Sequence, residues 1–314
     1  MKVLVTATSF KAGNPALKRL QEFADEIVLN PKGKPLTEDE LLPLVRDCDG
    51  YIAGLDFITA KVLSQCKKLK VISRYGVGVD RVDLEAAKAY GIKVCNTPGA
   101  NTNAVADLAF GLILGVARKL PALDNQTRGG EWVRSTGTEI YQKTLGILGL
   151  GAIGKAVAKR ALGFDMNILA YDPYLDGPYA KANNIKPASF DDIIREADVL
   201  SLHLPLLDET KNLISADVMR KMKPGAIIVN TARGGLIDED AAYELLKSGH
   251  LGGLGLDAYA QEPPEHSPLF ELENTVFTPH TASHTREAVK NMSDMSVQNL
   301  IEAFTDGKYP YAVV

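Results

Sequence analysis

The chain has 314 residues, of which 46% are hydrophobic and 24% charged, and a formal net charge of −4. This balance is typical of a globular protein and excludes a wholly disordered chain, a collagen-like repeat and a disulfide scaffold. The length suggests two domains, at roughly 100–200 residues each. The mild acidity gives no electrostatic reason to expect nucleic acid or a membrane surface as a partner.

In the first third of the chain, short apolar runs alternate with segments of helical period. Runs typical of buried strands lie at residues 3–5, 27–29, 51–53, 71–73 and 93–95. The helical patterns between them include residues 16–23, 60–65 and 84–90. Strands that are apolar on both faces and separated by helices predict a parallel α/β sheet.

A second series of the same kind begins near residue 144. Its strand patterns lie at residues 144–148, 167–171, 199–203, 226–230, 252–256 and 275–277. The helical patterns between them include residues 152–162, 189–196 and 239–247. Six strands with intervening helices predict a doubly wound sheet.

Two long helical patterns, residues 101–120 and 287–304, lie outside both series. The first connects the two predicted sheets, and the second follows the last strand and could return to pack on the first domain. We therefore predict a first domain of residues 1–100 plus 285–314 and a second domain of residues 101–284. Residues 125–142 have few periodic apolar positions and are predicted to form an extended excursion, a candidate arm of a dimer.

The cysteines and the hydropathy pattern indicate a cellular setting. Cys48, Cys66 and Cys95 are far apart and lack metal-ligand spacing, which favours reduced thiols in the cytoplasm. No window reaches the ~18 apolar residues of a membrane span. A soluble cytoplasmic protein without a metal site is the expectation.

A glycine motif stands between the first strand and the first helix of the second series. Gly149, Gly151 and Gly154 have G-x-G-x-x-G spacing, and Asp172 ends the next strand. In this context the glycines permit a tight turn, the approach of a pyrophosphate and close helix packing. Asp172 can accept hydrogen bonds from ribose hydroxyls, and residues 173–177 offer no basic side chain for a 2′-phosphate. The motif predicts NAD rather than NADP; a glycine-rich turn with an incidental carboxylate is the alternative.

Polar residues that could do chemistry follow later strands of this series, where parallel sheets place their ligands. Arg233 lies in a glycine-containing turn, and its guanidinium suits bidentate binding of a carboxylate. A surface ion pair is the alternative for Arg233. Asp257 ends the next strand, and Glu262 lies in a loop that two prolines stiffen; a solvated loop glutamate is the alternative there.

Five histidines compete for the role of an acid or base. His280 directly follows the last strand, and a histidine held by a carboxylate can take up a hydroxyl proton as hydride leaves the carbon. His203, at another strand end, is predicted to line the cofactor cleft. His284 is predicted to begin a helix, and His250 and His266 read as loop residues.

These residues carry a resemblance to a known family. The stretches concerned span most of the chain: residues 74–80, 96–101, 145–154, 230–235, 256–263 and 278–280. The chain resembles the D-isomer-specific 2-hydroxyacid dehydrogenases and, among them, a short form of the D-3-phosphoglycerate dehydrogenases. The resemblance implies two doubly wound parallel-sheet domains, a flavodoxin-like substrate domain and a Rossmann NAD-binding domain, with a cleft between them. It also implies a homodimer.

The resemblance implies roles for individual residues. Arg233 is the expected carboxylate clamp, His280 the general acid/base, and Glu262 the partner that orients the histidine and favours its protonated form. The substrate is expected to contact Tyr75 and the backbone N–H groups of Val77 and Gly78. Asp257 is assigned to the nicotinamide end of the cofactor. The full set of expected NAD contacts is Gly149, Gly151, Ala152, Ile153, Gly154, Asp172, Leu204, Thr231, Ala232, Arg233, Asp257 and Ser283.

The chain departs from the family pattern in three places. Some phosphoglycerate dehydrogenases hold the substrate phosphate with an arginine after the third strand, but residues 52–56 contain none, which leaves Arg134 on a partner's arm as an alternative contact. Residues 281–284 lack the glycine usual in the family. The sequence ends at Val314, so the C-terminal regulatory domain of many relatives, and feedback by serine, are not expected.

The implied activity is NAD-dependent hydride transfer at C2 of a small D-2-hydroxy acid, with D-3-phosphoglycerate and 3-phosphohydroxypyruvate as the expected pair. Reduction of glyoxylate or hydroxypyruvate by the same machinery is one alternative. An NAD(H)-sensing binding protein is another, because related transcriptional corepressors retain the Arg-Glu-His set. Formate dehydrogenase is discounted, since its relatives carry glutamine where this chain has Glu262.

Overall fold

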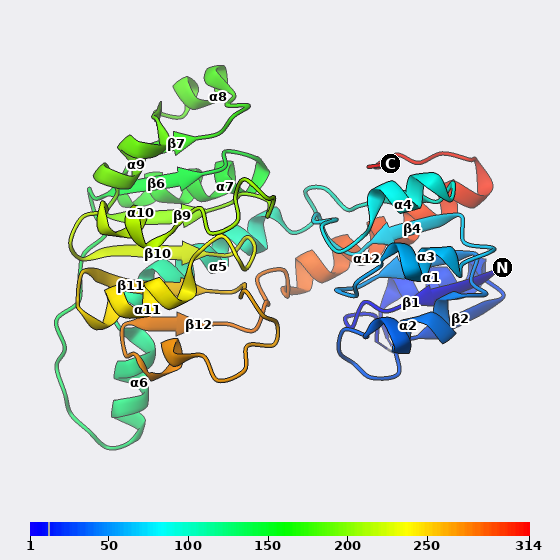
Figure 1. The fold of residues 1–314 in the computed structure, drawn as a ribbon, viewed down its shortest axis with the longest axis horizontal. Helices are drawn as coiled ribbons and strands as arrows, with labels where there is room; N and C mark the ends of the chain where they lie inside the picture. The colour runs from blue at the N-terminus through cyan, green and yellow to red at the C-terminus, as the bar shows by residue number, and fades with distance from the viewer. Residues whose placement is uncertain (12) are drawn as a thin grey trace. The chain divides into compact units, whose positions relative to one another are not determined.

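The computed structural model describes residues 1–11 and 13–314, which form two compact units (Figure 1). The first unit comprises Met1–Asn101 and Ser283–Val314, and the second comprises Thr102–Ala282. Every pairing between their named strands is parallel, which confirms the predicted α/β class. No helix in the described ranges is long and apolar enough to cross a membrane.

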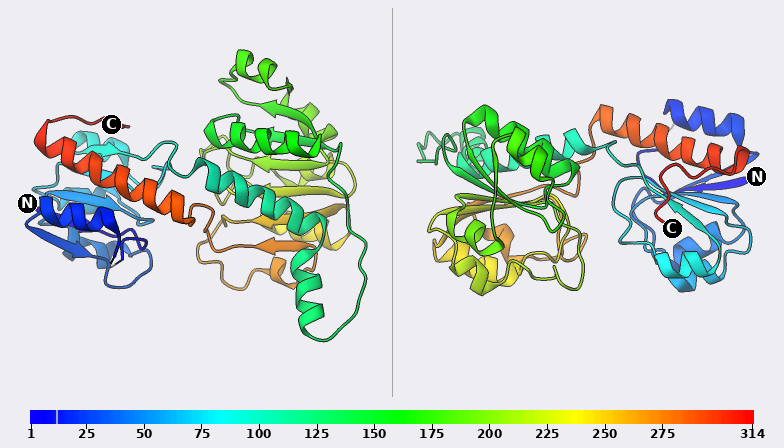
Figure 2. Two further views of the ribbon diagram at one scale, coloured as in Figure 1. Left: turned by 180° about the vertical axis from the view of Figure 1, so that it is seen from behind. Right: turned by 90° about the horizontal axis from the view of Figure 1, so that it is seen from above.

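The first unit contains a five-stranded sheet in the order β2-β1-β3-β4-β5, the flavodoxin-like order. Its strands are β1 (Lys2–Val5), β2 (Glu26–Leu29), β3 (Gly50–Ala53), β4 (Val71–Arg74) and β5 (Lys93–Cys95). Its helices are α1 (Pro15–Phe23), α2 (Glu38–Val45), α3 (Ala60–Ser64), α4 (Leu84–Ala89) and α12 (Arg286–Thr305). Helices α1 and α12 cover one face of the sheet, and the other three helices cover the opposite face (Figure 2).

The last 32 residues complete this unit. Helix α12 packs on α1 and β4, and Asn299 donates hydrogen bonds to Ser73 Oγ and the Asn96 carbonyl. Beyond the helix, Val313 N–H donates to the Val94 carbonyl at 2.7 Å. The C-terminal residues therefore pair with β5 at the edge of the sheet.

The second unit contains seven strands in the order β12-β11-β10-β9-β6-β7-β8. Counted from its own first strand, this is the Rossmann order with a seventh strand at one edge. The strands are β6 (Thr144–Leu148), β7 (Asn167–Tyr171), β8 (Ile185–Pro187), β9 (Val199–Leu202), β10 (Ala226–Asn230), β11 (Leu251–Leu256) and β12 (Thr275–Phe277). The sequence patterns missed β8, which has three residues and a single buried side chain.

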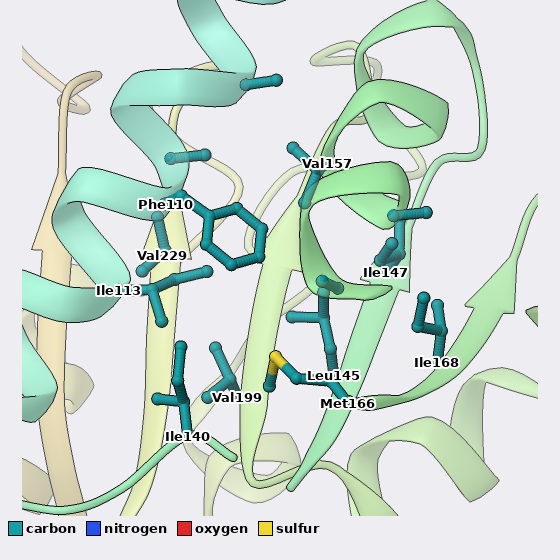
Figure 3. Packing of buried hydrophobic residues seen from close by; sticks show 14 of the residues in the cluster. Phe110, Ile113, Ile140, Leu145, Ile147, Val157, Met166, Ile168, Val199 and Val229 are labelled. Atoms are coloured by element: carbon teal, nitrogen blue, oxygen red, sulfur yellow. The ribbon is translucent and has the colours of Figure 1, made fainter. Parts of the chain in front are cut away.

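Helices cover both faces of this second sheet. They are α5 (Thr102–Ala117), α6 (Leu120–Arg128), α7 (Ala152–Ala161), α8 (Gly177–Ala182), α9 (Phe190–Glu196), α10 (Ala216–Arg220) and α11 (Glu239–Lys247), with 3₁₀ turns η1 (Leu162–Phe164) and η2 (Pro268–Glu271). Helices α5 and α7 lie on one face and contact each other, whereas α9, α10 and α11 lie on the other. Figure 3 shows Phe110 and Ile113 of α5 and Val157 of α7 packed over Leu145 and Val199.

The predicted excursion at residues 125–142 is partly wrong. Residues 125–128 form the last turn of α6, which begins with a proline in its first turn. Residues 131–140 have no regular secondary structure, and Trp132 among them is 85% exposed. None of the α6 residues is buried within this chain.

Candidate active site

The glycine motif adopts the geometry that dinucleotide binding requires. Gly149 follows β6 with a φ of +95°, and a Cβ there would lie 2.5 Å from the His203 carbonyl oxygen. A Cβ on Gly154 would lie 2.1 Å from the Gly149 carbonyl oxygen, so only glycine lets α7 pack this closely on the turn. Gly151 caps α7 and faces open space, which leaves the N-terminus of the helix accessible to an anion.

Asp172 lies beside this motif, after β7. Its Oδ2 accepts a hydrogen bond from Leu150 N–H at 2.7 Å, and its Oδ1 accepts one from Tyr174 N–H at 2.8 Å. An ionised carboxylate has about four acceptor positions, so Asp172 can hold the glycine turn and still accept from ribose hydroxyls. Lys155 of α7 also reaches this loop, with its Nζ 2.7 Å from Asp176 Oδ2, so a basic side chain from outside residues 173–177 lies beside them.

The ends of β9 and β10 complete this edge of the sheet. Thr231 is buried, and its Oγ1 has no hydrogen-bond partner among the described residues. Burial lowers the pKa of His203 from 6.5 to about 4, and its Nε2 lies 2.9 Å from Ser201 Oγ. Leu204 contacts the Gly149 turn. An orphaned hydroxyl, an open helix N-terminus and a carboxylate at adjacent strand ends fit NAD.

His280, which follows β12, forms a pair with Glu262 in the loop between β11 and β12. His280 Nδ1 donates to Glu262 Oε1 at 2.7 Å, and the two side chains are 27% and 16% exposed. Tyr259 N–H donates to the same Oε1 at 3.3 Å. Because the proton of the neutral imidazole then resides on Nδ1, Nε2 carries the lone pair that can accept a proton.

Asp257 fixes the loop that carries His280. It is 1% exposed and accepts hydrogen bonds from Thr278 Oγ1, Thr281 N–H and Ala282 N–H at 2.7, 2.8 and 2.9 Å. His280 itself has a φ of +49°, a left-handed conformation that costs a non-glycine residue roughly 1–2 kcal/mol. The three bonds to Asp257 hold the backbone on both sides of this residue.

Arg233 lies in a turn shaped by Asn230, at the end of β10. The Asn230 amide donates to the Arg233 carbonyl at 2.7 Å and accepts from Ala232 N–H at 3.0 Å. Arg233 Nη1 donates to the Ala232 carbonyl at 2.7 Å. A Cβ on Gly234 would lie 1.7 Å from the Tyr259 carbonyl oxygen, so this turn contacts the loop that leads to Glu262. Arg233, Glu262 and His280 therefore follow three neighbouring strands.

The predicted substrate contacts Tyr75, Val77 and Gly78 lie in the first unit, as does Ser283. Tyr75 Oη donates to the Val289 carbonyl of α12 at 3.1 Å, which orients the ring. The Asn96 amide donates to the Val77 carbonyl at 2.9 Å. The turn after β4 is thus fixed by hydrogen bonds within its own unit.

A model of the family described as "D-isomer specific 2-hydroxyacid dehydrogenase, NAD binding domain" matches residues 110–282. The chain belongs to this family. It is 42% identical to D-3-phosphoglycerate dehydrogenase of Methanocaldococcus jannaschii, over 92% of this chain and 55% of that protein. It is 38% identical to glyoxylate reductase of Thermococcus litoralis, over 98% of this chain and 95% of that protein.

The family fold extends over the whole chain. The structure of the TT0316 protein from Thermus thermophilus superimposes with a TM-score of 0.90 and 40% identity, and the match covers all of both chains. The chain spans about half the length of the curated phosphoglycerate dehydrogenases that it matches, but nearly all of several glyoxylate reductases. Its relatives in the 2-hydroxyacid dehydrogenase family thus differ in their named substrates.

The sequence motifs of this family member do not mark the residues that hold loops rather than ligands. Asn230, Tyr259 and Glu239 each hold a loop by a hydrogen bond to a backbone group. Tyr259 Oη donates to the Thr278 carbonyl at 2.7 Å, and burial raises the pKa of the phenol to about 12. Their position in the chain was the available signal, since Asn230 ends β10, Tyr259 lies three residues after β11 and Glu239 begins α11.

Proposed function

We propose that this chain is an NAD-dependent oxidoreductase that acts at C2 of a small D-2-hydroxy acid. The contact between His280 Nδ1 and Glu262 Oε1, at 2.7 Å, is the observation that carries this proposal. This contact leaves Nε2 as the atom of His280 that can accept a proton. The arginine turn and the glycine turn of the dinucleotide site follow other strands of the same sheet. General acid–base groups of this kind contribute about 10²–10⁴-fold to rate.

The proposed roles follow from the geometry. In oxidation, His280 Nε2 takes the hydroxyl proton, the C2–H bond breaks, and the carbon–oxygen bond becomes a carbonyl. NAD, when bound, supplies the acceptor of the hydride at nicotinamide C4. Glu262 stabilises the imidazolium that forms, and reduction returns the same proton from His280 to the substrate oxygen.

The binding roles remain proposals of the same kind. Arg233 binds the substrate carboxylate through its guanidinium, and the amides of Val77 and Gly78, with Tyr75, contribute contacts from the first unit. NAD is held by the glycine turn, Asp172 and Thr231, with Ala152, Ile153, Leu204, Ala232 and Ser283 as further contacts. For Asp257 we propose a position near the nicotinamide end, where it shapes the His280 loop.

For the substrate, we take 3-phosphohydroxypyruvate as the first candidate, because a D-3-phosphoglycerate dehydrogenase is 42% identical to this chain. Two observations favour glyoxylate or hydroxypyruvate as the second candidate. A Cβ on Gly54 would lie 3.0 Å from the Thr6 carbonyl oxygen, so this position offers no phosphate-binding side chain. In addition, glyoxylate reductases match this chain over nearly their whole length.

The test follows NADH absorbance with purified protein and each of three 2-oxo acids: phosphohydroxypyruvate, hydroxypyruvate and glyoxylate. We expect turnover of at least one of them, and we expect the His280→Asn variant, which binds NADH equally well, to lose about 10²-fold or more in kcat. Preference for the phosphorylated acid selects the first candidate. Tight NADH binding without turnover of any acid would contradict the enzyme and favour an NAD(H) sensor.

Two further parts of the proposal concern the setting of the enzyme. We propose a homodimer formed through the exposed segment around Trp132, and a cytoplasmic location. The three cysteines are buried free thiols, which suits a reducing compartment.

A further inference from the structure

A carboxylate outside the proposed machinery contacts the loop that carries Glu262. Glu239 is the first residue of α11, and its Oε1 accepts a hydrogen bond from Ala260 N–H at 2.7 Å. The side chain is partly buried, and burial raises the pKa of its carboxyl above the ordinary value of 4.5. The neighbouring Asp240 and the facing Glu262 raise the pKa further.

Two hydrogen bonds of Tyr259 connect the Ala260 amide, which this carboxylate holds, with the His280–Glu262 pair. Ala260 adjoins Tyr259, whose own N–H donates to Glu262 Oε1 at 3.3 Å. Tyr259 Oη donates to the carbonyl of Thr278, two residues before the histidine. Two consecutive amides of one loop are therefore held by two different carboxylates, Glu262 and Glu239. A displacement of Ala260 would therefore act through Tyr259 on Glu262 and on the segment that leads to His280.

We propose that Glu239 is a positioning residue for the proton-transferring pair His280–Glu262. It fixes Ala260 from the rigid first turn of α11, so that the Glu262 carboxylate stays within hydrogen-bond distance of the imidazole. This inference rests on the proposed function, because it assigns Glu239 to the support of a proton transfer at His280.

The electrostatic setting of Glu239 separates two features of its carboxylate, the acceptor oxygen and the negative charge. Glu239 of α11 and Glu262 of the β11–β12 loop are like charges that face each other, which is unfavourable, and burial of Glu239 adds to the cost. The N-terminus of α11 and the Ala260 amide offset part of it. An uncharged acceptor would hold the amide without this repulsion, so the decisive feature for positioning is the acceptor oxygen rather than the charge.

Two pairs of variants separate these features. Glu239→Ala removes the acceptor and Glu239→Gln retains it without the charge. Asp240→Ala and Asp240→Asn make the matched changes at the adjacent, exposed carboxylate of the same helix. For Glu239→Ala we expect a fall of about 10- to 100-fold in kcat, with KM for NADH unchanged, because small displacements of catalytic groups have costs of this order. Glu239→Gln should keep kcat within about threefold of wild type, as should both Asp240 variants.

Hydrogen exchange monitors the contact without reference to activity. Amides of residues 257–262 should exchange faster in Glu239→Ala than in wild type, and at the wild-type rate in Asp240→Ala. Equal exchange in wild type and Glu239→Ala would overturn the proposal, as would a Glu239→Ala variant that loses thermal stability but retains full kcat.

A double-mutant cycle tests whether Glu239 acts through Glu262. In a Glu262→Gln background, the additional change Glu239→Ala should lower kcat by less than about threefold, because the pair that it positions is already impaired. Losses that multiply would overturn the inference. A different result would contradict the proposed function: if His280→Asn retains turnover, the assignment of the base is wrong. If His280→Asn is inactive but Glu239→Ala is fully active, only the role of Glu239 is refuted.

Discussion

At the scale of single residues, the polar side chains at the strand ends are divided between two tasks. Asp172, Asn230 and Asp257 bond mainly to backbone groups and fix the shapes of loops. Arg233, Glu262 and His280 project from those loops. Substitution of a shaping residue should therefore displace a reacting group that it does not touch, and the strained φ of His280 makes its loop sensitive to such a change.

His203 gives a prediction on pH and stability. Its pKa is about 4 in the folded protein and near 6.5 in the unfolded chain. The unfolded state therefore binds an extra proton between these values, and the free energy of unfolding must decrease as the pH falls from 6.5 to 4. Between pH 6.5 and 4 the free energy of unfolding should fall less in the His203→Gln apoprotein than in the wild-type apoprotein. We expect the two decreases to differ by about 1–3 kcal/mol, as measured by urea unfolding.

The exposed His266 provides the control for this experiment. His266→Gln makes the same change at a histidine on the surface, so the comparison isolates the effect of burial at His203. Parallel curves for wild type and His203→Gln would show that His203 titrates alike in the folded and unfolded chains, contrary to expectation.

At the scale of elements, strands were predictable where an apolar run has two buried faces, as in β4 and β10. Helix α2 escaped notice although Thr37 and Glu40 form a capping box, because Pro43 lies inside the helix. Strand β8 is too short to show a pattern.

For the site, the sequence pointed to Arg233, Glu262 and His280 by their place after strands. The contact of Glu239 with Ala260 depends on tertiary packing, which no local pattern records.

The junction of β6 and α7 gives a prediction at this scale. A Cβ on Gly154 would lie 2.1 Å from a backbone oxygen, so Gly154→Ala must displace α7 from the glycine turn. We expect the free energy of unfolding to fall by about 1–3 kcal/mol and the Kd for NADH to rise at least about tenfold, measured by urea unfolding and by fluorescence titration. Gly163→Ala, where a Cβ meets nothing within 4 Å, is the matched control and should change both quantities little.

At the scale of the whole molecule, the segment around Trp132 carries exposed apolar side chains, and we propose that a second copy of the chain covers them. Trp132 is 85% exposed, Val133 is 52% exposed, and α6 buries none of its residues. Large exposed aromatic side chains dominate the energetics of many interfaces, where truncation of one costs about 2 kcal/mol or more. The proposed homodimer would remove these side chains from water.

Sedimentation equilibrium tests the proposed interface. Trp132→Ala should raise the dimer dissociation constant at least about tenfold, in line with the loss of one interfacial tryptophan. Tyr174, which is 94% exposed after β7, supplies the control, and Tyr174→Ala should leave the dissociation constant unchanged. A wild-type protein that sediments as a monomer at all concentrations would rule out the dimer.

The return of α12 to the first unit has a consequence for synthesis of the chain. The ribosome completes strands β1–β5 by residue 95, but the helix that covers β4 begins only at Arg286. At about 5–20 residues per second, this delay amounts to roughly 10–40 s. During that time the second unit is synthesised, while the part of the first sheet that α12 covers and the outer edge of β5 lack their intramolecular cover. Because exposed apolar surface and open strand edges favour aggregation, we expect the N-terminal sheet of the nascent chain to be a target for chaperones.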